Sequence, residues 1–313
     1  MRGVMWLREP SMDFEIPDDV TNHVKAIFAS CNNSVAIDLS KFPAIHEESL
    51  DSNLISCFAR NQQPVNLASN WVVRIDAHFI GGGRHFETWE VADIGLMMVF
   101  RYKGKVVKSK LAFLQSKKLY ANTLKYSEED PYVRRFGLGR LIVPDDEHAE
   151  IIKDKLLVFK ESSKYQAFRK ENKQQKTMRH FEGRWGMDLH YLFYNPVEIP
   201  LAVKMPVEIA SELGKNQIGC RVLSKRELDL ALKKSKVGYS PSFKYIKAHV
   251  PKVVDGVACE GGWRLEDFAA DLMLQCKAGL VDDSPNYESL SILMNQKQRP
   301  ISAAVSITFD MYD

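Results

Sequence analysis

The chain has 313 residues, of which 45% are hydrophobic, and a formal net charge of +3. It can bury a substantial core as one large domain or two smaller ones. No apolar stretch approaches the ~20 residues that a membrane-spanning helix needs, so no membrane partner is expected. Residues 1–14 carry four charged side chains and lack the apolar run of a signal peptide, which indicates a cytoplasmic protein.

The five cysteines are scattered and lack any C-x-x-C spacing. This pattern is typical of reduced thiols in a cytosol. It argues against a zinc site and against a disulfide framework.

Helices are predicted over residues 18–30 and 47–60, where Leu50, Leu54 and Phe58 form an apolar stripe. A strand over 71–80 and a hairpin with strands 91–101 and 106–117 follow. A helix is expected to begin at the acids 145–147, with Phe159 on its apolar face, and to continue with a break through 160–175. The remaining expected elements are strands at 189–194 and 218–223, a basic helix at 225–236, a loop containing Pro241 and Pro251, an amphipathic helix at 263–277 and an edge strand at 301–309.

The order of elements from residue 46 to about 223 is helix, strand, strand, strand, helix, strand, strand. This order predicts an α/β fold, with a mixed central sheet flanked by helices. We expect an N-terminal segment over 1–45 with one helix, a core over 46–224 and a partly helical C-terminal elaboration over 225–313.

The hairpin gathers polar side chains at one end. If its turn centres on Gly104, then Asp93 lies opposite Gln115, and the alternation of side chains puts Gln115 and Lys117 on one face. The apolar pattern helps to fix this register, since a slip of one residue would bury the wrong side chains.

Oxygen ligands at that end suit Mg²⁺, which usually takes one or two carboxylates. Asp93 and the carbonyl oxygen of Gln115 are candidate ligands. Glu47 shares the core-facing stripe of its helix and is the expected third ligand, with Glu48 as the alternative.

Two further carboxylates, Glu87 and Glu90, precede Asp93 and are additional candidates. Lys117 is placed to lower the pKa of an attacking water or to stabilise the charge that builds up on phosphorus. Each group also has an ordinary structural interpretation: a strand-entry cap for Asp93, a sheet polar residue for Gln115 and a surface lysine for Lys117.

Basic residues are concentrated in three stretches. Residues 101–120 hold seven bases and no acid, and residues 160–180 and 225–247 each hold seven bases and two acids. Such stretches are typical either of solvated lysine faces or of surfaces that bind nucleic acid. Three stretches together favour nucleic acid.

Asp93 at a strand start, the hairpin and Gln115-Ser116-Lys117 resemble the motif of the PD-(D/E)XK nuclease superfamily. More narrowly, they are similar to its Q-x-K branch, which includes Mrr-like restriction endonucleases and nuclease domains of bacterial anti-phage systems. The resemblance covers just over half of the chain and implies a restriction-endonuclease-like core. Ala92 replaces the proline of the family motif.

The resemblance implies a metal-dependent DNA endonuclease that acts in restriction or anti-phage defence, with Mg²⁺, or Mn²⁺ in its place, held by Glu47, Asp93 and Gln115. It also allows a partner protein of a defence system and a homo-oligomer. Phosphate contacts are expected from basic residues of two stretches: Lys108, Lys110, Lys118, Lys164, Arg169 and Lys170. The alternative is a non-catalytic nucleic-acid-binding or scaffold subunit with a nuclease-like fold. The neutral Gln115, which stands where a second acid is usual, favours this alternative.

Overall fold

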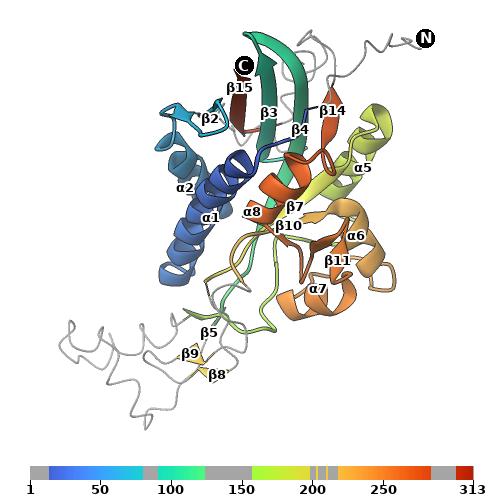
Figure 1. Ribbon diagram of the computed structural model, residues 1–313. Coiled ribbons are helices and arrows are strands. Elements are labelled where there is room, and N and C mark those ends of the chain that lie inside the picture. The colour runs from blue at the N-terminus through green and yellow to red at the C-terminus, as the bar shows by residue number, and fades with distance from the viewer. Residues whose placement is uncertain are drawn as a thin grey trace, which may run out of the picture.

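The computed structural model describes residues 14–79, 91–123, 157–197, 202–203, 209–210, 218–282 and 301–312. They form a mixed α/β structure with helices on both faces of a central sheet, as the sequence predicts (Figure 1). The helices are α1 (Asp18–Lys41), α2 (Glu47–Ala59), α5 (Lys173–Trp185), α6 (Lys225–Ala231), α7 (Phe243–His249), α8 (Leu265–Asp267) and the π-helical turn η2 (Phe268–Met273).

The strands vary in length from two residues to fourteen. They are β1 (Val65–Asn66), β2 (Trp71–Phe79), β3 (Ile94–Tyr102), β4 (Lys105–Lys118), β5 (Asn122–Thr123), β6 (Leu157–Val158), β7 (Leu189–Tyr194), β8 (Ala202–Val203), β9 (Ile209–Ala210), β10 (Arg221–Ser224), β11 (Val253–Val254), β12 (Val257–Ala258), β13 (Trp263–Arg264), β14 (Leu280–Asp282) and β15 (Ala303–Met311).

The central sheet follows the order β1-β2-β15-β3-β4-β7-β10-β13, and β14 pairs with β4 beside this path. β15 is parallel to β3 and β4 is parallel to β7, whereas β3 and β4 form an antiparallel hairpin. The parallel pair of β4 and β7 has α5 in the connection between its strands. The order α2, β2, β3, β4, α5, β7 therefore agrees with the predicted sequence of helix, three strands, helix and strand.

The hairpin has the predicted register at its open end, where Ile94 lies opposite Leu114. Its turn is Lys103-Gly104, both with positive φ (48° and 78°), as a tight two-residue turn requires. This turn alone would shift the pairing by one residue. A bulge between Phe100 and Arg101 corrects the shift before the polar end is reached.

The two faces of β4 meet different helices. The ring of Phe113 lies 5.7 Å from that of Phe181 in α5, and the hydroxyl of Ser116 contacts Asp51 in α2. Because side chains alternate along a strand, Gln115 and Lys117 belong to the face of Phe113. In Figure 1, α1 and α2 lie on one side of the sheet and α5 lies on the other.

The prediction of an edge strand near the C-terminus is wrong. β15 pairs along its length with β2 on one side and with β3 on the other. Apart from Ser306 and Asp310, its residues are buried, as is usual for a central strand. Residues 303–311 therefore complete the core sheet and do not elaborate it.

Several predicted helices also differ from the structure. Most of the helix expected from residue 145 lies outside the described residues, but its end is wrong, because 157–158 form β6. The helix before β7 is α5, over 173–185, and residues 160–172 are not helical. α6 ends at Ala231, earlier than expected.

Two more predictions, both for the C-terminal third of the chain, are wrong. α7 occupies the expected loop between Pro241 and Pro251, and the side chain of Ser242 caps it by accepting from the N–H of Tyr245. The amphipathic helix expected over 263–277 is broken into β13, α8 and η2.

Candidate metal and phosphate site at the end of β4

β4 continues past the start of β3, so part of its edge has no partner strand. Two carboxylates accept hydrogen bonds from the backbone N–H groups of this part. β3 pairs with β4 only as far as Leu114, whereas β4 continues to Lys118. The N–H of Ser116 donates to Oδ2 of Asp93 at 2.7 Å, and the N–H of Lys118 donates to Oε1 of Glu47 at 2.8 Å. Donors two residues apart on a strand are roughly 7 Å apart. Asp93 and Glu47 therefore lie near each other along the same edge.

The amide of Gln115 is buried and only half satisfied. Its Nε2 donates to Oδ2 of Asp93. Its carbonyl oxygen Oε1 is buried and has no hydrogen-bond partner within the described part of the chain. An unpaired buried acceptor costs about 1–3 kcal/mol, so such atoms are uncommon and call for a physical explanation.

Lys117 supplies the cation of the cluster. Its Nζ lies 3.6 Å from Oε2 of Glu47 and donates to the carbonyl oxygen of Ser116 at 2.7 Å. The residue is 5% exposed, so the interpretation as a surface lysine is wrong. Glu47, Asp93, Gln115 and Lys117, which the sequence analysis selected, are thus brought together.

The structure favours Glu47 over Glu48 as the third member of the site. α2 begins at Glu47, whose side chain is 17% exposed and bonded to β4, whereas Glu48 is exposed. Glu87 and Glu90 lie outside the described residues.

A further carboxylate, Asp51, contacts the end of β4 and was not predicted from the sequence. Its Oδ1 accepts from the hydroxyl of Ser116 at 2.5 Å and from the hydroxyl of Tyr194 at 2.6 Å. Asp51 lies one helical turn after Glu47, and this repetition of like charge on one helical face is the signal that was available in the sequence.

The electrostatic surroundings of Asp51 are unfavourable to its charge. Burial, and then the nearby charges of Asp93 and Glu47, raise the pKa of the Asp51 carboxyl well above its usual value, although the two hydroxyl donors oppose this shift. Burial also raises the pKa of Tyr194, whose hydroxyl remains a donor. The buried Asp51 carboxyl therefore lies close to the two carboxylates of Asp93 and Glu47.

The oxygen atoms of Asp93, Glu47 and Gln115 suit a hard divalent cation. Among the described residues, no three His, Cys, Asp or Glu side chains are grouped so that they could hold a metal ion. The present set instead combines two carboxylates with one amide oxygen, and that oxygen is the unpaired one. The residues present fit Mg²⁺ or Mn²⁺ in kind, with less charge than a site of three carboxylates.

Three of the six predicted phosphate contacts need correction, because their amines are already bound to backbone carbonyls. Lys110 is fully buried and donates to Met273 and Leu274 at the end of η2. Lys118 is 3% exposed and donates to Pro43 and Ile45. Burial lowers the pKa of the Lys118 amine, and Glu47 and Glu48 oppose this effect.

Lys170 is partly buried and donates to the carbonyl oxygens of Leu232, Lys233 and Ser235, at 2.7, 3.2 and 2.6 Å. These carbonyl oxygens belong to the turn that follows α6, which ends at Ala231. Of the other predicted contacts, Lys164 and Arg169 are exposed. Lys108 is half-buried, with its Nζ 5.2 Å from the centre of the Phe14 ring.

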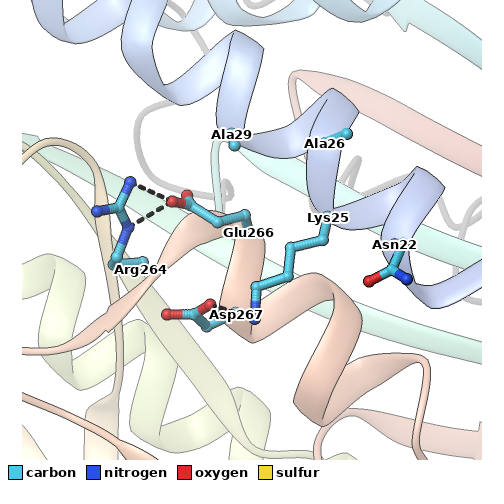
Figure 2. Close-up of a pocket in the computed structure, with 7 residues that line it drawn as sticks. All are labelled: Asn22, Lys25, Ala26, Ala29, Arg264, Glu266 and Asp267. Atoms are coloured by element: carbon cyan, nitrogen blue, oxygen red, sulfur yellow. Dashed lines mark hydrogen bonds and ion pairs between the residues drawn. The ribbon is translucent and has the colours of Figure 1, made fainter. Parts of the chain in front are cut away.

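A separate open hollow of about 400 Å³ lies between α1 and α8 (Figure 2). Its charges are compensated: Lys25 lies 2.9 Å from Asp267, and Arg264 pairs with Glu266. The hollow offers no unpaired group comparable to Gln115, so we place the candidate site at the end of β4.

No protein-family model, curated protein or solved structure matches this chain. Within the described residues, no helix is both long enough and apolar enough to cross a membrane.

Proposed function

We propose that this chain is a metal-dependent endonuclease that hydrolyses phosphodiester bonds of DNA. The observation that carries the proposal is the buried carbonyl oxygen of Gln115, which has no partner among the described residues and belongs to an amide that donates to Asp93. A cation at this position would supply the missing partner and offset the repulsion from Asp93 and Glu47, which adds to burial in raising the pKa of Asp51.

Glu47, Asp93 and Gln115 would hold Mg²⁺ or Mn²⁺. When bound, the metal ion would supply Lewis-acid chemistry at the scissile phosphate and lower the pKa of a bound water. Lys117 lies within 3.6 Å of Glu47, so its amine would stand close to the phosphate and stabilise the charge that develops there. Asp51 would hold the end of β4 in place through Ser116.

The arrangement of strands supports the resemblance to the PD-(D/E)XK superfamily. The hairpin of β3 and β4 carries Asp93 and Gln115-Ser116-Lys117, and β7 pairs in parallel with the end that holds the motif. β15, inserted between β2 and β3, departs from a simple meander of three strands. A cytoplasmic role in restriction or anti-phage defence is part of the proposal and rests on this resemblance alone.

The experiment that tests the proposal is nicking of supercoiled plasmid by the purified protein. We expect open-circular and then linear DNA with Mg²⁺ or Mn²⁺, and intact plasmid with EDTA. Plasmid that stays intact at every metal concentration would reject the proposal, whereas cleavage that persists in EDTA would reject its dependence on metal.

One observation favours the alternative of a non-catalytic nucleic-acid-binding or scaffold subunit. The Gln115 amide donates to Asp93, and backbone N–H groups of β4 occupy oxygens of Asp93 and Glu47. These bonds stabilise the strand end without any metal. The alternative predicts DNA binding that is unchanged by EDTA, together with intact plasmid.

A further inference from the structure

The three basic stretches of the sequence meet at one point of the fold. Tyr120, just after β4, forms an isolated β-bridge with Lys164, and Lys164 forms another with Ser242. The N–H of Tyr120 donates to the carbonyl oxygen of Lys164 at 3.0 Å. Residues 44 and 78 positions apart in the chain are thus paired, with Lys164 common to both bridges.

The last two stretches then run alongside each other. At one end, the backbone N–H of Lys244 donates to the backbone carbonyl oxygen of Glu161 at 3.2 Å. At the other end, the backbone N–H of Gly238 donates to the backbone carbonyl oxygen of Lys170 at 2.9 Å. Between them, the N–H of Tyr165 donates to Pro241 at 3.0 Å. We call these two paired segments, residues 160–170 and 236–247, the basic ridge.

The charge of the basic ridge is nearly all of one sign. Its two segments hold seven lysines and arginines, and Glu161 is their single acid. Lys164, Arg169, Lys236 and Lys244 are exposed. None of these four forms an ion pair with another described residue, in contrast to Lys25, Arg179 and Lys225 elsewhere. Unpaired exposed cations of this density attract polyanions.

The basic ridge contacts the chain just after the carboxylate cluster, through the bridge between Tyr120 and Lys164. Tyr120 is three residues from Lys117, a distance of roughly 10 Å along an extended chain. The Nζ of Lys118 lies 4.6 Å from the centre of the Tyr120 ring, and the N–H of Lys118 donates to Glu47. A chain of phosphates that enters the cluster would therefore pass directly onto the ridge.

We propose that the basic ridge binds the phosphate backbone of duplex DNA next to the bond that is cut. The inference rests on the proposed function for the identity of the polyanion. An anionic membrane would also match the charge of the ridge, but it would not explain why the ridge contacts the chain next to the carboxylate cluster. Phosphate contacts position a duplex without reading its bases, so we expect binding of unrelated sequences with similar affinity.

The test uses the full chain in EDTA, where no metal-dependent cleavage interferes, and a fluorescently labelled duplex titrated at several KCl concentrations. The ridge variant carries Lys164→Ala, Arg169→Ala and Lys244→Ala. The control variant removes three exposed cations elsewhere: Lys41→Ala, Arg60→Ala and Lys277→Ala. Thermal unfolding verifies that both variants fold.

We expect the dependence of log K on log salt to fall by about 0.9 for each phosphate that the ridge variant no longer neutralises, and to be unchanged in the control. Equal slopes in the ridge variant and the wild type would overturn the inference. So would retained duplex binding by a ridge variant that has lost binding to phosphatidylserine vesicles.

Plasmid nicking by the wild type separates this inference from the proposed function. Nicking together with an unchanged salt dependence in the ridge variant would overturn the ridge and leave the nuclease assignment standing. Intact plasmid together with loss of duplex binding in the ridge variant would support the ridge and reject the nuclease assignment.

Discussion

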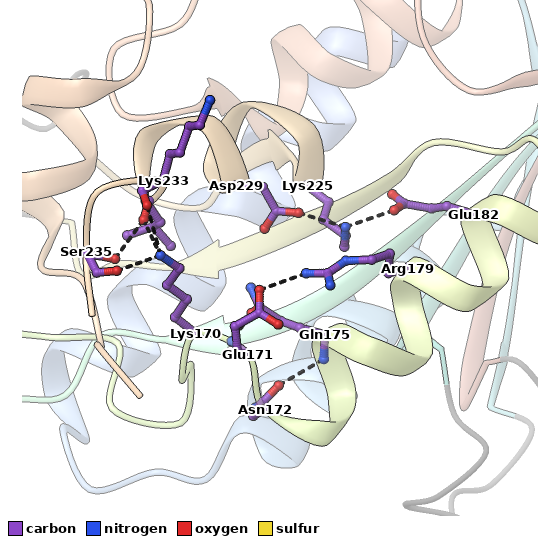
Figure 3. A network of polar contacts seen from close by, with 11 residues as sticks. Lys170, Glu171, Asn172, Gln175, Arg179, Glu182, Lys225, Asp229, Lys233 and Ser235 are labelled. Carbon is purple, nitrogen blue, oxygen red and sulfur yellow. Dashed lines mark hydrogen bonds and ion pairs between the residues drawn. The ribbon is translucent and has the colours of Figure 1, made fainter. Parts of the chain in front are cut away.

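Two clusters of charged residues, each built around a buried lysine, differ in how well their charges are compensated. In the network between α5 and α6, the Nζ of Lys225 lies 2.9 Å from Glu182 and 2.8 Å from Asp229, and Arg179 pairs with Glu171 at 2.9 Å (Figure 3). Burial alone would lower the pKa of Lys225, but its hydrogen bonds to the two carboxylates outweigh burial and raise it. The charges of this network satisfy each other.

The cluster at the end of β4 lacks that balance. Lys117 approaches Glu47 only to 3.6 Å, while burial, together with the charges of Asp93 and Glu47, raises the pKa of Asp51. The carbonyl oxygen of Gln115 is unpaired among the described residues. Polar groups that satisfy each other stabilise a fold, whereas an uncompensated buried group is expected where a ligand completes the arrangement. We therefore interpret the first cluster as structural, and we propose that the second is the functional site.

The largest expected effect comes from Lys117→Ala. We expect the rate of plasmid nicking to fall by about 10²–10³-fold, as when one charge-stabilising donor is removed from a transition state. The melting temperature should change little, because Lys117 approaches one carboxylate at 3.6 Å, whereas Lys225 pairs with two at 2.9 and 2.8 Å. Nicking at the wild-type rate would show that Lys117 takes no part in the reaction. Lys234→Ala, at an exposed lysine, is the matched control.

Lys225→Ala should have the opposite effects: it should lower stability and leave the rate of plasmid nicking unchanged. The side chain of Lys225 is 4% exposed and pairs with two carboxylates that are 23% and 35% exposed. Removing it takes away the cation that both carboxylates contact, so we expect the free energy of unfolding to fall by about 1–3 kcal/mol, below the range for fully buried pairs. Chemical denaturation measures this loss, and the nicking rate of the remaining folded protein should match the wild type. A variant with unchanged stability and impaired nicking would invert the comparison.

Asp51→Asn should alter the pH dependence of stability. Because the pKa of Asp51 is raised in the folded state, that state holds its proton above the pH at which the unfolded chain loses it. Stability of the wild type therefore decreases as pH rises from the unfolded pKa towards the folded pKa, by at most about 1.4 kcal/mol per pH unit from this group.

Asparagine retains an acceptor for Ser116 and Tyr194 but does not ionise, so the Asp51→Asn variant should lose this decrease. Denaturation of the metal-free protein across a pH series measures the difference. Parallel stability curves for the variant and the wild type would mean that Asp51 does not titrate with a raised pKa.

Local patterns in the sequence were sufficient for the elements that surround the candidate site. The apolar stripe of α2, the two strands of the hairpin and the polar change at Gln115 each follow from neighbouring residues, and together they place Glu47, Asp93, Gln115 and Lys117. Asp51 was missed because it follows Leu50 directly and was hidden by the apolar stripe. Asp51 accepts a hydrogen bond from the hydroxyl of Tyr194, which lies 143 positions away in the chain.

Other features depend on pairings that no local pattern encodes. β15 alternates weakly, and its position between β2 and β3 is fixed by pairing across more than 200 residues. Lys110 belongs to a basic stretch and looks like a surface lysine. Its amine instead donates hydrogen bonds to the carbonyl oxygens of Met273 and Leu274, at the end of η2. α5 is a strongly polar helix that packs through Met178 and Phe181, too few apolar residues for a clear period.

Binding of Mn²⁺ to the folded protein, followed by electron paramagnetic resonance of the free ion, tests the central claim most directly. The uncompensated cluster predicts a saturable site in the wild type and in Lys225→Ala, and a site weakened by at least about tenfold, 1.4 kcal/mol, in Asp93→Asn. Absence of saturable binding in the wild type, or equal binding by Asp93→Asn, would contradict the assignment of the cluster at the end of β4 as a metal site.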